Sequence, residues 1–357
     1  MHHPIRPIGN KRTAANRDNP VPPQWPSYTG TSQFVGTSPS GRVTVFVDPT
    51  IGGPGLQNAQ DLVNDADRVV TANDTHIFGT AGEPVAVIIF ALGGATDGTG
   101  GADHGGCDYT TGAAIEVCAS FGNFPRVSAL FEAELCECSM GGNLCGVSTG
   151  EALSRWCASV IGNDALADFA TAPQWAQSGM PDYVNHTDPT DQNADSTGCG
   201  MAFLSWLMSQ GYGLDQIAQV MVSLGDAGTL AQLYANLTSD VASNALPAFL
   251  AAAEALPNGV TNDDPFGGAS QTAQLPHLAP WTVELSGKVF ATILAGVAAG
   301  KAEHQIVASV RAVLVAAPTA KAAAATAKLA GASATSCSAK SRRLIPPGRP
   351  KTVTRVV

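Results

Sequence analysis

At 357 residues the chain is long enough to bury a large core. A hydrophobic content of 45% and a mean hydropathy of +0.08 exclude a disordered protein. Residues 21–300 contain five Lys/Arg against 27 Asp/Glu, whereas residues 301–357 contain ten Lys/Arg against one acidic residue. The acidic body excludes nucleic-acid binding, which needs basic residues to neutralise phosphates. The basic C-terminal segment is compatible with a polyanion or with a solvated flexible end.

Cysteine usage indicates the compartment. Seven of the eight cysteines lie between residues 107 and 199, and no paired CxxC knuckle of a structural zinc site is present. This clustering predicts one to three disulfides and therefore an extracellular or periplasmic protein; the alternative is buried reduced cysteine. No apolar leader is visible at the start of the sequence. No run of about 18 uncharged apolar residues occurs, so we expect no membrane span.

The first half of the chain predicts a small sheet with helices. Residues 1–40, rich in Pro, Gly, Ser and Thr, predict a disordered or extended arm. Alternating β-branched residues predict a strand over 42–48, and a continuous apolar run predicts a central strand over 84–92. Helical spacing of apolar residues predicts a helix over 56–70. A glycine-rich loop over 93–112 and a further strand over 113–119 follow.

The second half is predicted to be mainly helical. Pro125 and the capping residues before Glu151 mark two helix starts, and Gly, Asp and Pro residues separate the helices that follow. Residues 257–280 have the composition of a linker, 281–317 of a small ordered segment and 318–357 of a low-complexity basic tail. The helices are expected over 126–138, 149–161, 165–170, 198–210, 214–223, 229–237 and 246–255.

Two acidic helical segments carry the functional signal. The first is FEAELCE at 131–137, which contains Glu134 and Glu137, and the second is GEALSR at 150–155, which contains Glu151. Three carboxylates placed close together repel one another, so a cation, a proton or an arginine must compensate them. Arg155, four residues after Glu151, is a candidate for that arginine.

This order of elements resembles the N-terminal half of zincin-type metallopeptidases of the gluzincin branch. In those enzymes the two histidines of an H-E-x-x-H helix bind Zn²⁺, the Glu acts on water, and a Glu from the next helix completes the site. The resemblance covers residues 42–256 and implies a zincin-like α+β domain over 41–256. It places Glu134 at the general base, Glu137 at the second His position and Glu151 at the third ligand. The segments 187–191 and 198–210 are also similar to bacterial secreted proteins.

The motif departs from the zincin pattern at both histidines. Ala133 stands at the first His position and supplies no donor atom, and Glu137 supplies oxygen in place of nitrogen. Oxygen ligands suit Ca²⁺, Mg²⁺ or Mn²⁺ better than Zn²⁺. The structural alternative is an acidic helix pair in which the glutamates have capping roles or pair with Arg126 and Arg155.

Two further candidates lie outside the acidic helices. His104, in the glycine-rich loop, is a candidate for the missing imidazole; the alternative is an exposed loop histidine. Asp188, Asp191, Asn193 and Asp195 have the alternating oxygens of a calcium loop but lack the EF-hand glycine and glutamate, and the alternative is a set of Asx turns before the next helix.

These observations predict a secreted, metallopeptidase-related protein that hydrolyses a peptide or protein substrate through a degenerate HExxH site. Glu134 is the expected catalytic base, and Glu137, Glu151 and His104 are the expected ligands of a divalent metal, zinc or calcium. The alternative is a non-catalytic extracellular binding or structural module on the same fold. The sequence contains no signal from which an oligomeric state could be predicted.

Overall fold

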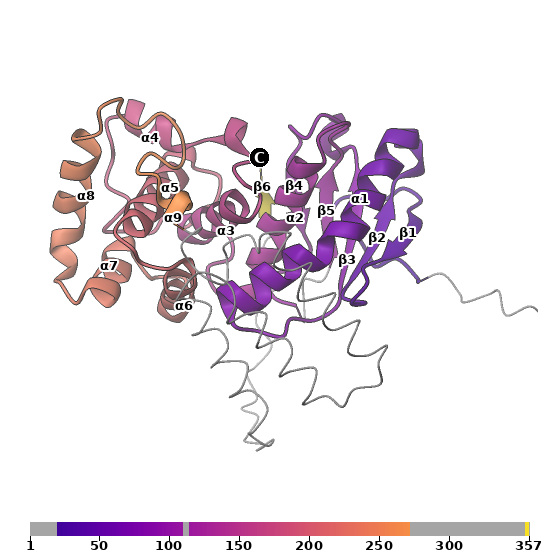
Figure 1. Cartoon of the computed structure of the whole chain (residues 1–357), viewed down its shortest axis with the longest axis horizontal. Helices are drawn as coiled ribbons and strands as arrows, with labels where there is room; N and C mark the ends of the chain where they lie inside the picture. The colour runs from indigo at the N-terminus through magenta and orange to yellow at the C-terminus, as the bar shows by residue number, and fades with distance from the viewer. Residues whose placement is uncertain (1–19, 110–113, 272–353, 357) are drawn as a thin grey trace, which may run out of the picture.

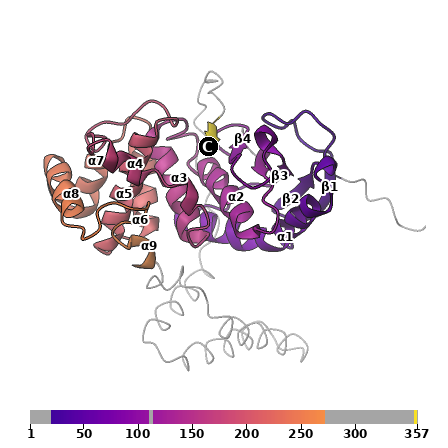
Figure 2. The same ribbon diagram turned by 90° about the horizontal axis from the view of Figure 1, so that it is seen from above.

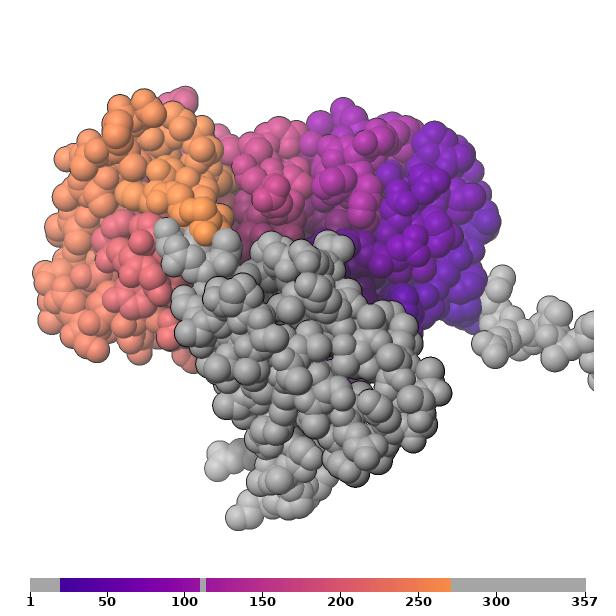
Figure 3. All heavy atoms as spheres, viewed as in Figure 1, coloured from indigo at the N-terminus to yellow at the C-terminus, as the bar shows by residue number. Residues whose placement is uncertain are grey.

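A computed structural model of the chain describes residues 20–109, 114–271 and 354–356. It is an α+β structure with a mixed sheet at one end and a group of helices at the other (Figure 1). Residues 20–271 run across the molecule from the sheet to the helical end, with the middle of this range between the two (Figure 3). The predicted fold class, a small N-terminal sheet followed by a mainly helical half, is therefore confirmed at this level.

The sheet contains five strands from the first third of the chain, in the order β1-β2-β3-β5-β4. The three inner strands, β2, β3 and β5, are parallel, and the outer strands β1 and β4 are antiparallel to their neighbours. A short strand β6 (Thr354–Val356) pairs antiparallel with the outer edge of β4. The bounds are β1 Gln33–Thr37, β2 Val43–Val47, β3 Val85–Phe90, β4 Ala102–His104 and β5 Ala114–Cys118.

Two helices pack against the sheet and against each other (Figure 2). They are α1 (Gly52–Val70) and α2 (Phe124–Ser139). The apolar stripe that helical spacing predicts on α1 is buried from Ala59 to Val70, whereas Leu56 at its start is 44% exposed. A π-helical turn, Thr71–Phe78, continues α1 and also contacts α2. Short 3-10 turns occur at Pro49–Ile51, Leu92–Gly94, Ala167–Phe169 and Ala242–Asn244.

The helical half has its own apolar core, in which Trp175, Phe203, Trp206 and Phe249 form a network of ring contacts. The helix α3 lies between this core and α2, so it joins the two halves (Figure 1). The helices are α3 Ser148–Ile161, α4 Ala172–Gln177, α5 Ala194–Ser209, α6 Leu214–Leu224, α7 Leu230–Thr238, α8 Ala245–Glu254 and α9 Gly268–Gln271.

Most predicted elements are observed within a few residues of their expected ends. Several findings differ from the sequence expectations. Helix α4 (Ala172–Gln177) forms outside the expected helices, and the helix expected over 165–170 is a short 3-10 turn. The strand β4 lies inside the segment expected to be a continuous loop over 93–112, and β1 lies inside the expected arm over 1–40. Asp263, in the expected linker, is buried and accepts hydrogen bonds from the backbone N–H groups of Thr171 and Ala172 at 2.8 and 2.7 Å. The predicted segment 281–317 lies outside the described residues.

One disulfide, Cys107–Cys145, is present among the described residues. The other described cysteines are buried and lie outside this disulfide: Cys118, Cys136, Cys138, Cys157 and Cys199. The prediction of at least one disulfide is confirmed, and such a bond is typical of an oxidising compartment. None of the helices within the described ranges has both the length and the apolar character needed to cross a membrane.

Close packing of α5 against the start of α4 requires a glycine. A β-carbon at Gly198 would lie 2.5 Å from the carbonyl carbon of Thr171 and 2.9 Å from the nitrogen of Ala172. We expect Gly198→Ala to lower the free energy of unfolding by about 1–3 kcal/mol, because the overlap is with backbone that cannot rotate away. Urea denaturation followed by circular dichroism measures this loss.

Gly53→Ala is the matched control. Gly53 lies in the first turn of α1, and an added β-carbon meets nothing within 4 Å. This variant should be neutral or more stable by about 0.4–1 kcal/mol, because alanine restricts the unfolded chain. Equal stability changes for the two variants would contradict the packing at α5.

Candidate metal centre

Helix α2 brings its acidic residues into the interior because it is enclosed on every side. Asn123 caps its first turn by accepting a hydrogen bond from the N–H of Arg126, and Pro125 follows at a position where no N–H is needed. The helix packs against α1, β5, β4 and α3. Every residue from Arg126 to Cys138 is buried as a result, including Glu132, Glu134 and Glu137.

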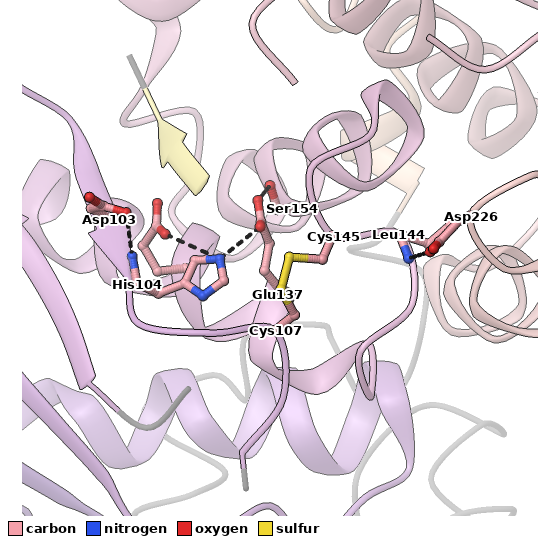
Figure 4. The surroundings of a disulfide bond; sticks show 9 residues. Asp103, His104, Cys107, Glu137, Leu144, Cys145, Ser154 and Asp226 are labelled. Carbon is pink, nitrogen blue, oxygen red and sulfur yellow. Dashed lines mark hydrogen bonds and ion pairs between the residues drawn. A yellow bond between two sulfur atoms is a disulfide. The ribbon is translucent and has the colours of Figure 1, made fainter. Parts of the chain in front are cut away.

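His104 comes from the strand β4, which lies beside α2. Its side chain is buried, and its Nε2 lies 2.9 Å from Oε2 of Glu137 (Figure 4). Its backbone N–H donates to the carboxylate of Asp103 at 2.9 Å, which helps to fix the end of the strand. His104 is therefore a buried partner of the acidic helix, and the alternative of an exposed loop histidine is wrong.

Glu134 is a second carboxyl group near the same imidazole nitrogen. Its Oε2 is 3.9 Å from Nε2 of His104, and the side chain is fully buried. Neither carboxyl oxygen of Glu134 has a hydrogen-bond partner. Buried polar groups in folded proteins are nearly always hydrogen-bonded, so an unpartnered carboxyl group is a site that a proton or a ligand must complete.

Glu151 is placed differently from the other predicted ligands. It lies in the first turn of α3, and its Oε1 is 3.8 Å from NH1 of Arg155. The same arginine reaches Asp263, at 3.9 Å, and donates to the carbonyl oxygen of Phe169. The predicted pairing of Arg155 with Glu151 is observed. Glu151 thus pairs with Arg155 on α3, whereas Glu137 on α2 pairs with His104.

Ser154 connects the two helices at this point. Its Oγ lies 3.2 Å from Oε1 of Glu137 and 3.0 Å from the carbonyl oxygen of Glu151, so the hydroxyl can donate to either acceptor. When the hydroxyl donates to Oε1 of Glu137, the other carboxylate oxygen, Oε2, faces His104 (Figure 4).

The protonation states of the centre follow from burial and close charges. Burial disfavours the imidazolium of His104, but the neighbouring Cys138 and Glu137 side chains outweigh this cost, so the pKa of His104 lies well above its ordinary value. Burial raises the pKa of Glu134 well above its ordinary range, against the opposing effect of His104. Burial, with the charge of Glu137, raises the pKa of Glu151 to about 8, although Arg155 opposes the shift.

Few cations are available to neutralise these carboxyl groups. Residues 20–271 contain four arginines and no lysine. Each arginine has its own acidic partner: Arg42 pairs with Asp74, Arg68 with Asp65, Arg126 with Asp168, and Arg155 with Glu151 and Asp263. The predicted pairing of Arg126 with the glutamates of α2 is therefore not observed. Within these residues, His104 is the basic group next to Glu134 and Glu137.

The donor set that the structure brings together contains nitrogen, oxygen and sulfur. Single ligand atoms of His104, Glu137 and Cys145 all lie within 4.8 Å of one another, which is a group that could hold a metal ion. The sulfur of Cys145 is bonded to Cys107, so in this state it is a disulfide sulfur rather than a thiolate. The sequence analysis missed Cys145, because its position beside His104 depends on the fold of the connection between α2 and α3.

The predicted calcium loop has a structural role in the observed fold. Asn193 caps α5 by accepting a hydrogen bond from the N–H of Asp195, and its amide donates to Asp188 at 2.7 Å. This arrangement is an Asx turn before a helix, as the alternative interpretation expected.

No protein-family description matches the chain, and neither the curated proteins nor the solved structures contain a match.

Glu132 is a second buried carboxyl group on α2, outside the centre. Both of its oxygens lack hydrogen-bond partners, and burial raises its pKa well above the ordinary value of 4.5. Between pH 4.5 and this raised pKa the folded chain keeps a proton that the unfolded chain releases. The raised pKa therefore lowers stability as pH rises through this range, by about 1.4 kcal/mol for each pH unit.

We expect Glu132→Gln to remove this dependence, because glutamine carries no titrating proton. The variant should gain stability relative to the unmodified protein as pH rises from 4.5 to 7.5, with little difference at pH 4.5. Urea unfolding at these two pH values measures the change. A difference that stays constant between them would mean that Glu132 is ionised in the folded protein.

Proposed function

We propose that this chain is an extracellular, metallopeptidase-related protein that binds a divalent cation in a closed site formed by His104, Glu137 and Glu134. The observation that carries the proposal is the buried carboxyl group of Glu134, which has no hydrogen-bond partner and lies 3.9 Å from the same imidazole nitrogen that contacts Glu137. A divalent cation between these groups would satisfy the unpartnered oxygens and neutralise both carboxylates.

The residues present fit such an ion. Two carboxylates and one imidazole converge from β4 and α2, and Ser154 orients one of the carboxylates from α3. An outer partner that orients a ligand is typical of protein metal sites. The imidazole nitrogen favours zinc or manganese over calcium, which takes oxygen ligands.

The resemblance to zincin-type metallopeptidases supports the location of the site. The resemblance places a metal beside the acidic residues of α2. The imidazole that contacts α2 comes from the antiparallel strand β4. The Cys107–Cys145 disulfide supports an extracellular setting.

Burial favours binding over hydrolysis. The side chains of His104, Glu134 and Glu137 are 1%, 0% and 2% exposed. A catalytic metal site keeps an open coordination position that substrate can reach, whereas a structural site is closed by protein ligands. A closed site therefore fits the non-catalytic alternative better than the peptidase.

Stability measurements with and without metal test this proposal. Zinc added to metal-free protein should raise the melting temperature, and chelator should reverse the change, because a ligand that binds only the folded state stabilises it. Glu134→Gln and Glu137→Gln should each weaken zinc binding by about tenfold or more. Isothermal titration calorimetry measures the affinities.

Glu132→Gln is the matched control for these variants. It removes a buried carboxyl group from the same helix but lies outside the centre, so its zinc affinity should equal that of the unmodified protein. Zinc binding that is unchanged in Glu134→Gln and Glu137→Gln would reject the site.

Cation binding should weaken steeply at low pH. The raised pKa values of His104 and Glu134 mean that in the metal-free protein both groups keep their protons to a higher pH than usual, and both must release them to bind an ion. We expect the apparent zinc affinity to fall by roughly tenfold to a hundredfold for each pH unit below neutrality. Calorimetric titrations between pH 6 and pH 7.5 measure this slope, and an affinity that is independent of pH would contradict these proton positions.

Peptide-bond hydrolysis is the second candidate, and the free carboxyl group of Glu134 favours it. Glu134 stands at the general-base position of the zincin motif and has no competing hydrogen bond. A bound zinc ion would supply Lewis-acid chemistry beside this carboxylate. Cleavage of unfolded protein substrates by the zinc-loaded chain, lost in Glu134→Gln and kept in Glu132→Gln, would establish the hydrolase. Absence of cleavage by a zinc-loaded sample would reject the hydrolase and retain the proposal of a non-catalytic cation-binding protein.

A further inference from the structure

The disulfide lies directly beside the candidate centre. Cys107 follows β4 closely in the chain, and Cys145 lies in the connection between α2 and α3, so the bond links the two elements that supply His104 and Glu137 (Figure 4). The sulfur of Cys145 is within 4.8 Å of ligand atoms of both His104 and Glu137, and Cys145 is the disulfide partner placed in this group. The disulfide sulfur of Cys145 thus lies where a metal ligand could be.

A disulfide sulfur is a poor metal ligand, whereas a thiolate is a strong ligand for zinc. Reduction by an external dithiol breaks the S–S bond. The two electrons and two protons produce one thiol at Cys107 and one at Cys145, and the dithiol becomes a disulfide. The Cys145 thiol releases its proton when the sulfur binds a metal.

We propose that reduction of Cys107–Cys145 converts the centre into a zinc site with Cys145, His104 and Glu137 as ligands. The proposal rests on the proposed function, because it needs His104 and Glu137 to bind a cation. One thiolate, one imidazole and one carboxylate form a ligand set typical of zinc. Glu134, whose buried oxygens have no hydrogen-bond partner and lie as close as 3.9 Å to the same imidazole nitrogen, is the candidate for a fourth ligand. The redox state of the disulfide then determines whether the centre has a thiolate ligand, and therefore how strongly it prefers zinc.

The backbone keeps Cys145 near the centre without the disulfide. The N–H of Leu144 donates to Oδ1 of Asp226 at 2.7 Å, and the N–H of Gly142 donates to the carbonyl oxygen of Cys107 at 2.8 Å. These hydrogen bonds hold the connection just before Cys145, so we expect its main chain to stay in place when the disulfide is reduced.

Two single substitutions separate the role of Cys145 from the loss of the disulfide. Cys107→Ser leaves a thiol at position 145, and Cys145→Ser leaves a thiol at position 107. Both variants lose the same covalent link, so any general loosening of the fold is matched between them. Cobalt(II) is the probe, because a bound thiolate gives a sulfur-to-cobalt charge-transfer band.

Cobalt titrations of the full-length chain should give this band in Cys107→Ser and in reduced unmodified protein, but not in the oxidised protein or in Cys145→Ser. Zinc affinity should be roughly tenfold or more higher in Cys107→Ser than in Cys145→Ser. A band of equal strength in both single variants, or in the Cys107→Ser/Cys145→Ser double variant, would assign the thiolate to another cysteine such as Cys138 and overturn the proposal.

Outcomes for the oxidised protein keep the two proposals apart. Metal binding by the oxidised protein together with no charge-transfer band in Cys107→Ser and in the reduced protein would overturn the thiolate site and leave the proposed function intact. Binding that occurs only when the Cys145 thiol is available would support the thiolate site and contradict a cation site in the oxidised chain. Absence of binding in every form would reject both.

Discussion

The charge balance of buried acidic groups constrains the middle of this structure. Four glutamates on α2 and α3 are buried in a region where each arginine between residues 20 and 271 already has an acidic partner. Burying an uncompensated carboxylate costs several kcal/mol, so the groups must be protonated or must share a cation. His104 supplies one positive charge, and it serves two carboxyl groups at 2.9 and 3.9 Å. The centre is therefore one charge short when both glutamates are ionised.

Protons and a metal ion are two ways to meet the same requirement. Without metal, a charged His104 pairs with Glu137 while Glu134 stays protonated, which the raised pKa values of His104 and Glu134 describe. In the proposed metal-bound state, His104 and Glu134 release their protons, and these two groups and Glu137 become ligands. The fold supports both states, because α2 and β4 are held by the sheet and α3 is anchored through Arg155. The proposed cation site is thus enclosed by protein rather than open to a cleft.

The sequence predicted the elements whose signals are local. The apolar run of β3 and the helical spacing of α1 indicated their positions directly, and Pro125 marked the start of α2. The strand β4 was missed, because three residues among glycines have no periodicity and are ordered by pairing with β5. For the same reason the burial of His104 could not be predicted, because it depends on the pairing of β4 with β5 and on the contact with Glu137, 33 residues later. The place of Cys145 and the packing of Asp263 also depend on contacts between distant segments.

Crystallographic anomalous scattering tests the central claim most directly. Crystals of the oxidised full-length protein, grown with zinc near neutral pH and measured on both sides of the zinc absorption edge, should show one strong anomalous peak. The account predicts that this peak lies between Nε2 of His104 and the carboxylates of Glu134 and Glu137. Density that shows His104 hydrogen-bonded to Glu137 with no anomalous peak between them, or a peak bound only by surface residues, would contradict it.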